Sequence, residues 1–279
     1  MDERRSSYHF QQVSIGEEAE LLRLKEQALM GWDKEHRTLR SFGLKDGMKV
    51  LEAGSGPGFI TEQLVKGLPN GSVTALEIDE VLLGKARQML SDVPASRLTF
   101  IQGSVYRTEL PDDTYDFVIA RLLFLHLIDP VEAAIELRRV LKPGGKLVII
   151  DVDDAIFGAI HPDIDVLPSI LKKLAALKAS KGGSRHIGRS LPRLLSGSGF
   201  TDVDMEAVIQ HSDLHGIEGF RRVLDVGQFA GFYRSGIISP EEYEALHRSY
   251  DQFVQAPDAH AMLVFLMACG TKPQGACAD

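Results

Sequence analysis

The sequence predicts an α/β fold around a doubly wound, mainly parallel β-sheet. Between residues 48 and 151, short apolar segments alternate with helical patterns, and turn or acidic residues separate them. The segment 146–151 is almost wholly apolar, which is typical of a strand that is covered on both faces. Strands and helices that alternate in this way build a parallel sheet with helices on either side.

The individual elements follow from periodicity and from capping residues. Apolar residues at helical intervals predict one or two helices before the first strand. Asp79 can cap a helix that starts at Glu80, and Asp129 with Pro130 opens another helix that stops at 142–145. Strands are expected at 48–53, 72–78, 98–102, 115–120, 146–151, 200–210 and 261–269, and helices at 17–42, 59–68, 80–90, 130–141, 166–179 and within 217–257.

We expect one domain with additions, because no linker-like segment divides the chain. The alternation of strands and helices breaks after Asp151. The expected division is an N-terminal helical cover at 1–44, a main domain at 45–270 with helical insertions at about 155–190 and 217–257, and a flexible tail at 271–279.

Composition and charge narrow the function classes. The net charge of -8 comes without a stripe of Lys and Arg, so nucleic acid is not an expected partner. Two cysteines argue against a disulfide framework and favour a reducing, cytoplasmic location. No window holds the ~18 apolar residues of a membrane span, and no group of side chains has metal-ligand spacing. We therefore expect neither membrane nor metal partners, while the oligomeric state stays open.

A glycine-rich turn follows the first strand. Residues 50–58 read V-L-E-A-G-S-G-P-G, and such a turn lets the backbone approach a ligand closely. A dinucleotide site would need a third glycine where Phe59 stands, and the carboxylate of Glu52 would repel a diphosphate. S-adenosylmethionine carries a sulfonium and an ammonium and no phosphate, so Glu52 favours that cofactor.

A second carboxylate supports the same interpretation. Glu77 ends the second strand about 20 residues past the glycines, where a carboxylate can accept hydrogen bonds from both hydroxyls of a ribose. Its position alone suits either cofactor. The conjunction of Glu52, Phe59 and Glu77 favours S-adenosylmethionine over a dinucleotide.

These motifs resemble those of the class I (Rossmann-like) S-adenosylmethionine-dependent methyltransferases, particularly the small-molecule type similar to the ubiquinone-biosynthesis enzymes. The stretches 76–79 (L-E-I-D), 110–118 (L-P-D-D-T-Y-D-F-V) and 139–145 (R-V-L-K-P-G-G) occur in that family's order and spacing. The resemblance covers roughly residues 45–153. It implies a seven-stranded sheet of order 3-2-1-4-5-7-6 with strand 7 antiparallel, and a cofactor across the carboxyl ends of the first strands.

The resemblance also implies roles for individual residues at the cofactor. Glu52 and Gly54 would meet the methionine part, Gly56 would allow a close backbone approach, and Glu77 would bind the ribose. At position 104 the family usually has aspartate, so the adenine amino group would meet the Ser104 hydroxyl or the next backbone amide. The expected cofactor-binding residues are Glu52, Gly54, Gly56, Glu77, Ile78, Ser104, Val105 and Arg121.

The acceptor is expected to be a small molecule. Methyltransferases of nucleic-acid adenine or protein glutamine carry an Asn-Pro-Pro-Tyr type signature where this chain has Arg121 and Leu122. His126, past the fourth strand, and Asp153, past the fifth, are the candidates for a general base, although either can instead hold its own loop. The unperturbed pKa of histidine, about 6.5, suits neutral pH and favours His126.

The sequence thus predicts an enzyme that transfers a methyl group from S-adenosylmethionine to an oxygen or nitrogen of a small organic molecule. The insertions after the fifth strand are expected to form a helical cover over the acceptor. Two alternatives stay open. One is a non-methylating protein that binds S-adenosylmethionine or S-adenosylhomocysteine, and the other is a nucleotide-cofactor oxidoreductase, which Glu52 and Phe59 disfavour.

Overall fold

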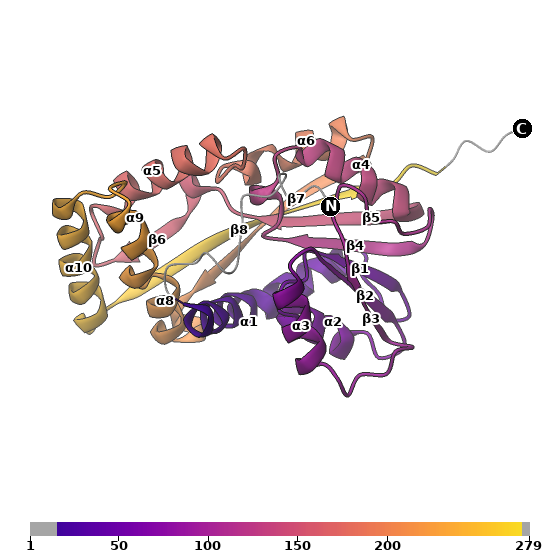
Figure 1. Ribbon diagram of the computed structural model, residues 1–279, viewed down its shortest axis with the longest axis horizontal. Coiled ribbons are helices and arrows are strands. Elements are labelled where there is room, and N and C mark those ends of the chain that lie inside the picture. Colours follow the sequence, from indigo (N-terminus) through magenta and orange to yellow (C-terminus); the bar gives the residue numbers. More distant parts are fainter. Residues whose placement is uncertain (1–15, 275–279) are drawn as a thin grey trace, which may run out of the picture.

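One mixed β-sheet organises the protein (Figure 1). The structure is a computed structural model and describes residues 16–274. The strands take the order β3-β2-β1-β4-β5-β8-β6, and β7 pairs with β8. They are β1 (Lys49–Ala53), β2 (Ser72–Glu77), β3 (Leu98–Gln102), β4 (Tyr115–Arg121), β5 (Leu141–Asp151), β6 (Gly158–His161), β7 (Thr201–His211) and β8 (His260–Thr271).

The predicted strand order is confirmed. The strands expected at 200–210 and 261–269 are β7 and β8, and β8 runs antiparallel to both β5 and β7. The additional strand β6 was not predicted. It pairs with residues 260–263, the part of β8 that extends beyond the end of β5. Its four residues are mostly exposed and show no apolar-polar alternation, so no sequence pattern marks them.

Helices cover both faces of the parallel part of the sheet. Val50 of β1 packs in a cluster with α1 and α2, whereas its neighbour Leu51 packs in a second cluster with α4 and α6. Successive strand residues point to opposite faces, so β1 joins two cores. The α-helices in the described part are α1 (Glu17–Ser41), α2 (Phe59–Gly67), α3 (Glu80–Met89), α4 (Pro130–Val140), α5 (Leu167–Ser180), α6 (Leu191–Gly197), α7 (Ser212–His215), α8 (Ile217–Val223), α9 (Ala230–Arg234) and α10 (Pro240–Gln255).

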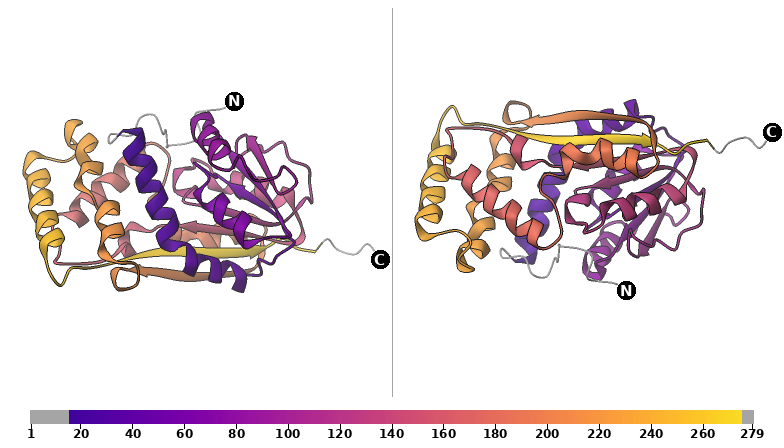
Figure 2. Two further views of the ribbon diagram at one scale, coloured as in Figure 1. Left: turned by 90° about the horizontal axis from the view of Figure 1, so that it is seen from below. Right: turned by 90° about the horizontal axis from the view of Figure 1, so that it is seen from above.

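A third, smaller core lies beyond the carboxyl ends of the parallel strands. There α5, α9 and α10 gather at the end where β8 begins (Figures 1 and 2). Ile170 of α5 and Leu246 of α10 belong to one apolar cluster that is separate from the two clusters of the sheet. The long helix α1 passes between this helical end and the sheet and contacts both α2 and α8 (Figure 2). Helices therefore cover the carboxyl ends of the strands on more than one side.

Parts of the predicted division lie outside the described residues. These are residues 1–15 of the N-terminal cover and residues 275–279 of the tail. Helices do fall within both predicted insertions, namely α5 in the first and α8, α9 and α10 in the second. The division itself stays a prediction. Within residues 16–274, no helix has both the length and the apolar character needed to cross a membrane.

Candidate active site

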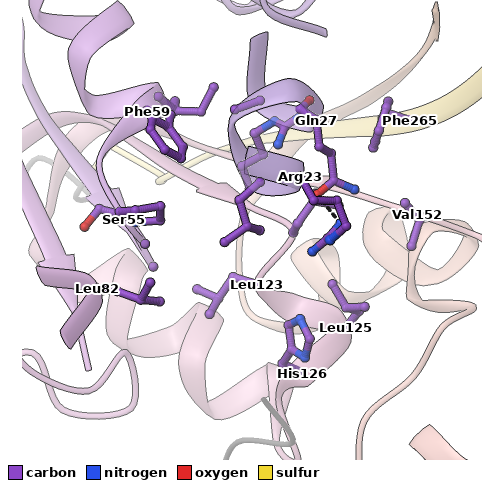
Figure 3. Close-up of a pocket in the computed structure, with 18 of the residues that line it drawn as sticks. Arg23, Gln27, Ser55, Phe59, Leu82, Leu123, Leu125, His126, Val152 and Phe265 are labelled. Carbon is purple, nitrogen blue, oxygen red and sulfur yellow. Dashed lines mark hydrogen bonds between the residues drawn. The ribbon is translucent and has the colours of Figure 1, made fainter. Parts of the chain in front are cut away.

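A pocket of about 330 Å³ opens at the carboxyl ends of β1, β2 and β4. Its wall is formed by α1, the turn after β1, the end of β2, residues 121–126 and the middle of β8. Ser55 and Leu82 lie on one side, Arg23 and Gln27 of α1 on the other, and His126 at a far corner (Figure 3). The volume lies within the range of small-ligand sites.

Backbone geometry explains the glycines of the turn. Gly54 has φ 73° and Gly56 has φ 55°, both in the left-handed region that favours glycine. A Cβ on Gly54 would lie 3.0 Å from the Leu123 side chain, whereas a Cβ on Gly56 would meet no atom within 4 Å. Both residues line the pocket. The turn therefore presents bare backbone to the cavity, with open space beside Gly56.

Glu77 ties the end of β2 to this turn. Its Oε2 accepts a hydrogen bond from the Gly56 N–H at 2.7 Å, and its Oε1 accepts from the N–H groups of Ile78 and Asp79, each at 2.9 Å. Burial raises the pKa of the carboxyl, while the three N–H groups oppose that shift. Three accepted bonds leave lone-pair capacity on a carboxylate, so Glu77 can hold the turn and still accept from a ligand hydroxyl.

Glu52 is an acid of the pocket wall whose pKa is strongly raised. It is buried, and its Oε2 accepts a hydrogen bond from the Thr61 hydroxyl of α2 at 2.6 Å. Burial, together with the nearby charge of Glu77, raises the pKa of Glu52 to about 8. The carboxyl is therefore mostly protonated at neutral pH in the unliganded protein. A cation placed beside it would favour the ionised form, so the Glu52 carboxyl would lose its proton when a cationic group binds.

A buried hydroxyl in the same wall has no hydrogen-bond partner within residues 16–274. Ser55 Oγ makes no hydrogen bond to any residue in the described part of the chain, although it is shielded from solvent. An unsatisfied buried hydroxyl costs about 1–3 kcal/mol, which a ligand group can recover. This end of the pocket fits S-adenosylmethionine. Glu52 can pair with a cationic group, Glu77 has lone pairs left for ligand hydroxyls, and the glycine turn exposes its backbone.

Arg121 enters the pocket wall as half of a buried ion pair. Its Nε and Nη2 contact the carboxylate oxygens of Glu35 in α1 at 2.7 and 3.0 Å, and Nη2 also donates to the Gln27 carbonyl at 3.0 Å. The side chains of Arg121 and Glu35 are only 8% and 0% exposed. The guanidinium lies over the ring of Phe265, 5.4 Å from its centre. Arg121 therefore docks α1 onto β4 and β8.

His126 ends a short 3₁₀ turn, Phe124–His126, that a buried acid holds in place. Asp151, the last residue of β5, accepts hydrogen bonds from the N–H groups of Leu125 and Val152 at 3.0 and 2.9 Å. Burial raises the pKa of Asp151 to about 7. Burial, with the nearby charge of Lys178, lowers the pKa of His126 to about 3, so the imidazole is neutral across the physiological range.

Asp153 has a different environment. It does not line the pocket. Its carboxylate accepts from both Nε and Nη2 of Arg189, from the Ala155 N–H at 3.1 Å, and it contacts His186 Nδ1 at 3.2 Å. The arginine and the hydrogen bonds outweigh burial and lower the pKa of the carboxyl. Asp153 therefore acts here as a cap and an ion-pair partner, and its catalytic role stays a prediction without support from the geometry.

Residues 51–149 match the family model described as a methyltransferase domain. The chain carries a methyltransferase domain. An uncharacterised methyltransferase of Schizosaccharomyces pombe is 37% identical over 111 residues, 38% of this chain and 40% of the relative. The ubiquinone/menaquinone biosynthesis C-methyltransferase UbiE of Cronobacter sakazakii is 25% identical over 158 residues, 55% of this chain and 63% of the relative. The chain thus spans less than two thirds of each of these curated relatives.

Solved structures share the fold of the methyltransferase domain. A complex between a Haloferax volcanii Trm112 methyltransferase activator and a methyltransferase has a TM-score of 0.59 at 17% identity and covers 94% of this chain and 99% of that chain. A Haemonchus contortus phosphoethanolamine N-methyltransferase in complex with S-adenosyl-L-methionine has a TM-score of 0.56 at 19% identity and covers 88% and 53%. The predicted family, enzyme class and cofactor are confirmed for the domain, because the matched model is a methyltransferase domain and the Haemonchus contortus enzyme is described with S-adenosyl-L-methionine.

The methyltransferase domain brings most of the predicted site residues together. Ser104 and Val105 do not line the pocket; the Ser104 hydroxyl accepts from the Tyr106 N–H at 3.3 Å, and Val105 packs in a core cluster. The roles of all these residues stay predictions. The predicted residues that line the pocket are Glu52, Gly54, Gly56, Glu77, Ile78, Arg121 and His126.

Sequence reasoning missed a group of residues around the far end of the pocket. Arg23 comes from α1 and Arg185 from the loop after α5, and both line the cavity. Each is paired with a buried acid, Glu20 for Arg23 and Asp154 for Arg185. Lys178 lies behind His126. A signal existed for Lys178, because it follows the buried Leu174 by one helical turn and so shares its face.

Proposed function

We propose that the protein transfers the methyl group of S-adenosylmethionine to an oxygen or nitrogen atom of a small organic molecule. The observation that carries the proposal is a polarised pocket. Buried carboxyl groups of Glu52 and Glu77 stand at one end, and the neutral imidazole of His126 stands at the other. The cationic cofactor and the acceptor therefore meet chemically different ends of one pocket.

The residues of the first end suit the cofactor. Glu52 would meet the ammonium of the methionine part, Glu77 the ribose hydroxyls, and Ile78 the adenine. The bare backbone at Gly54 and Gly56 would let the ligand approach the turn. When bound, S-adenosylmethionine supplies an electrophilic methyl carbon on a sulfonium, which an in-line nucleophile displaces.

The residues of the second end handle the acceptor. Helices α1 and α8 and the apolar side chains of Leu122, Leu123 and Phe157 line the cavity and limit the access of water. Holding two reactants in line in such a site contributes about 7–11 kcal/mol in favourable cases. A hydroxyl or protonated amine must also lose a proton, and His126 is the titratable side chain placed to exchange one. A titratable side chain at this end fits an acceptor whose O–H or N–H bond must lose its proton.

The non-methylating alternative has one observation in its favour. The [4+2]-cyclase SpnF shares the fold, with a TM-score of 0.53 at 20% identity. A fold hosts several chemistries, so the fold alone does not establish methyl transfer. The expected location in the cytoplasm, without nucleic-acid or membrane partners, stays part of this proposal.

Calorimetry and a labelling assay test the proposal together. The protein should bind S-adenosylmethionine and S-adenosylhomocysteine and should not bind NAD or NADP. Incubation with S-adenosylmethionine that carries a trideuterated methyl group and a small-molecule cell extract should yield labelled products by mass spectrometry. Binding of NAD, or binding of S-adenosylmethionine with no labelled product from any extract, would contradict methyl transfer. The position of the label in the product decides between oxygen, nitrogen and carbon.

A further inference from the structure

A lysine lies directly behind the pocket histidine. Nζ of Lys178, in α5, is 2.9 Å from Nδ1 of His126. His126 lines the pocket, whereas Lys178 is not among the described residues of its wall. The two side chains come from segments 52 residues apart in the chain, and each is largely withdrawn from solvent.

The charge state of the lysine dictates the tautomer of the histidine. An ammonium has three donors and no acceptor, so Nδ1 of a neutral imidazole must accept from it, and the ring proton then resides on Nε2. In that state Nε2 carries an N–H and has no lone pair with which to take up a proton. A neutral lysine amine can instead accept from Nδ1–H. The ring proton then resides on Nδ1, and Nε2 offers a lone pair.

We propose that Lys178 is the terminal proton acceptor of methyl transfer and that His126 relays the proton to it. This inference rests on the proposed function. In the reactive state the lysine is a neutral amine and Nδ1 of His126 carries the ring proton. The acceptor's O–H or N–H bond breaks, its proton joins Nε2, and the Nδ1 proton passes to Nζ. The electron pair left on the acceptor forms the bond to the methyl carbon, and the carbon–sulfur pair stays on sulfur.

The charges around the pair support this division of roles. Burial lowers the pKa of Lys178 to about 8, and it lowers the pKa of His126 far below its ordinary value. When the pair binds an additional proton, that proton therefore resides on the lysine, and it is released near physiological pH. Three nearby cations favour the neutral forms: Arg185 acts on both groups, Lys181 on the lysine and Arg23 on the imidazole. The acid Asp151 of β5 opposes them by favouring the charged lysine.

Nitrogen NMR tests the relay without an acceptor molecule. Protein with ¹⁵N-labelled histidine, saturated with S-adenosylhomocysteine, is titrated from pH 6 to pH 10, and the His126 signals are assigned from their loss in His126→Gln. We expect the Nε2–H tautomer at pH 6 and a change to the Nδ1–H tautomer through about pH 8. A tautomer that stays the same across this range would overturn the proposal. Because no turnover is needed, this result is independent of whether methyl transfer occurs.

Two substitutions of Lys178 and one control complete the test. Lys178→Arg keeps a permanent donor beside Nδ1, so His126 should remain the Nε2–H tautomer up to pH 10. Lys178→Met removes the partner, and the pH-dependent change of tautomer should disappear. Lys181→Met, which removes a nearby charge at an exposed position, should keep the change with a small shift in its midpoint. A wild-type titration in Lys178→Arg would contradict the assignment.

The pH dependence of turnover gives a second readout once an acceptor is in hand. The wild-type rate should rise through the pKa of Lys178 and level off above it. At pH 9, Lys178→Arg should be slower by roughly 10²- to 10⁴-fold, the usual contribution of a positioned base, and its rate should not rise between pH 7 and 9. A rate that rises in the same way in wild type and Lys178→Arg would rule out lysine as the proton acceptor.

Discussion

The two ends of the pocket are built in different ways. The cofactor end comes from one continuous stretch, residues 52–79, and its acids are held by backbone N–H groups and one hydroxyl. The acceptor end is assembled from α1, the turn after β4, Val152 just past β5, the loop after α5, and α8. Its charged side chains are held by other charged side chains. A continuous motif can be recognised in a sequence, whereas an assembled wall depends on the packing of distant helices.

The largest effect is expected where α1 docks onto the sheet. Glu35→Ala would leave Arg121 buried without a counter-charge, which costs about 3–5 kcal/mol in buried pairs. Urea denaturation should show that loss in the free energy of unfolding. Glu62→Ala, which breaks the exposed pair with Lys66, should change it by no more than about 0.5 kcal/mol.

A double variant separates charge from packing in the same measurement. Glu35→Ala combined with Arg121→Leu removes both charges and should recover part of the lost stability. If Glu35→Ala costs no more than Glu62→Ala, the buried pair does not hold the acceptor end together, and the contrast between the two ends fails.

The sequence predicted β1, β2, β4 and the second half of β5 because these segments are apolar and largely buried. Strand β6 escaped prediction because its residues are mostly exposed and its pairing depends on the length of β8. The prediction of a functional acid at the end of β5 was limited in the same way. Asp151 and Asp153 are two positions apart, and only the exact end of the strand decides which one is buried beneath the 3₁₀ turn.

The residues of the cofactor end could be predicted from the sequence more completely than those of the acceptor end. Glu52 and Glu77 were found because each stands at a fixed place relative to a strand end. The partners of Arg121 and His126 lie 86 and 52 residues away, in α1 and α5, and no local pattern connects them. Helical periodicity shows which face of α5 is buried but not which residue the face meets.

The second prediction concerns the cofactor end alone. Glu77→Ala should weaken the binding of S-adenosylhomocysteine by roughly ten- to a hundredfold, because about 1.5–3 kcal/mol is lost with each charge-assisted hydrogen bond. The Gly56 N–H would also lose its acceptor. Calorimetry measures the change, and Glu80→Ala in the first turn of α3 is the matched control, since that side chain does not line the pocket. Equal affinities in the two variants would refute the ribose assignment.

The third prediction concerns the pH dependence of that binding. The raised pKa of Glu52, about 8, means that a ligand ammonium placed beside it must displace a proton below that pH. Affinity for S-adenosylhomocysteine should therefore fall by up to about tenfold per pH unit from pH 7 to pH 5.5, with close to one proton released. Calorimetry in buffers of different ionisation enthalpy counts that proton. Glu52→Gln should bind more weakly at pH 7 and lose the slope; an unchanged slope would assign the proton to another group.

The raised pKa of Glu52 also affects the stability of the unliganded protein. A carboxyl with a pKa raised in the folded state stabilises the fold below its unfolded pKa, and this contribution is lost as pH rises to about 8. The unliganded protein should therefore lose stability between pH 5 and pH 8, by at most about 1.4 kcal/mol per pH unit from this group. Urea denaturation of Glu52→Gln should show a smaller loss over that range. Identical pH dependence in both proteins would mean that Glu52 is ionised throughout.

The smallest effect is expected at two serines that sequence alone does not distinguish. Ser55 lines the pocket with a buried hydroxyl that has no partner in the described residues, whereas the Ser104 hydroxyl already accepts from the Tyr106 N–H away from the pocket wall. Ser55→Ala removes an unsatisfied group, so the unliganded protein should be as stable as wild type or slightly more stable, while binding of S-adenosylhomocysteine should weaken by about 1 kcal/mol, roughly fivefold. Ser104→Ala should lose a little stability and change binding by less than about twofold. Calorimetry and urea denaturation should therefore separate the two variants, because Ser55→Ala loses binding and keeps stability, whereas Ser104→Ala loses stability and keeps binding. The reverse pattern, with binding lost in Ser104→Ala and kept in Ser55→Ala, would extend the cofactor site toward the end of β3 and would place the adenine where the resemblance, rather than the pocket, puts it.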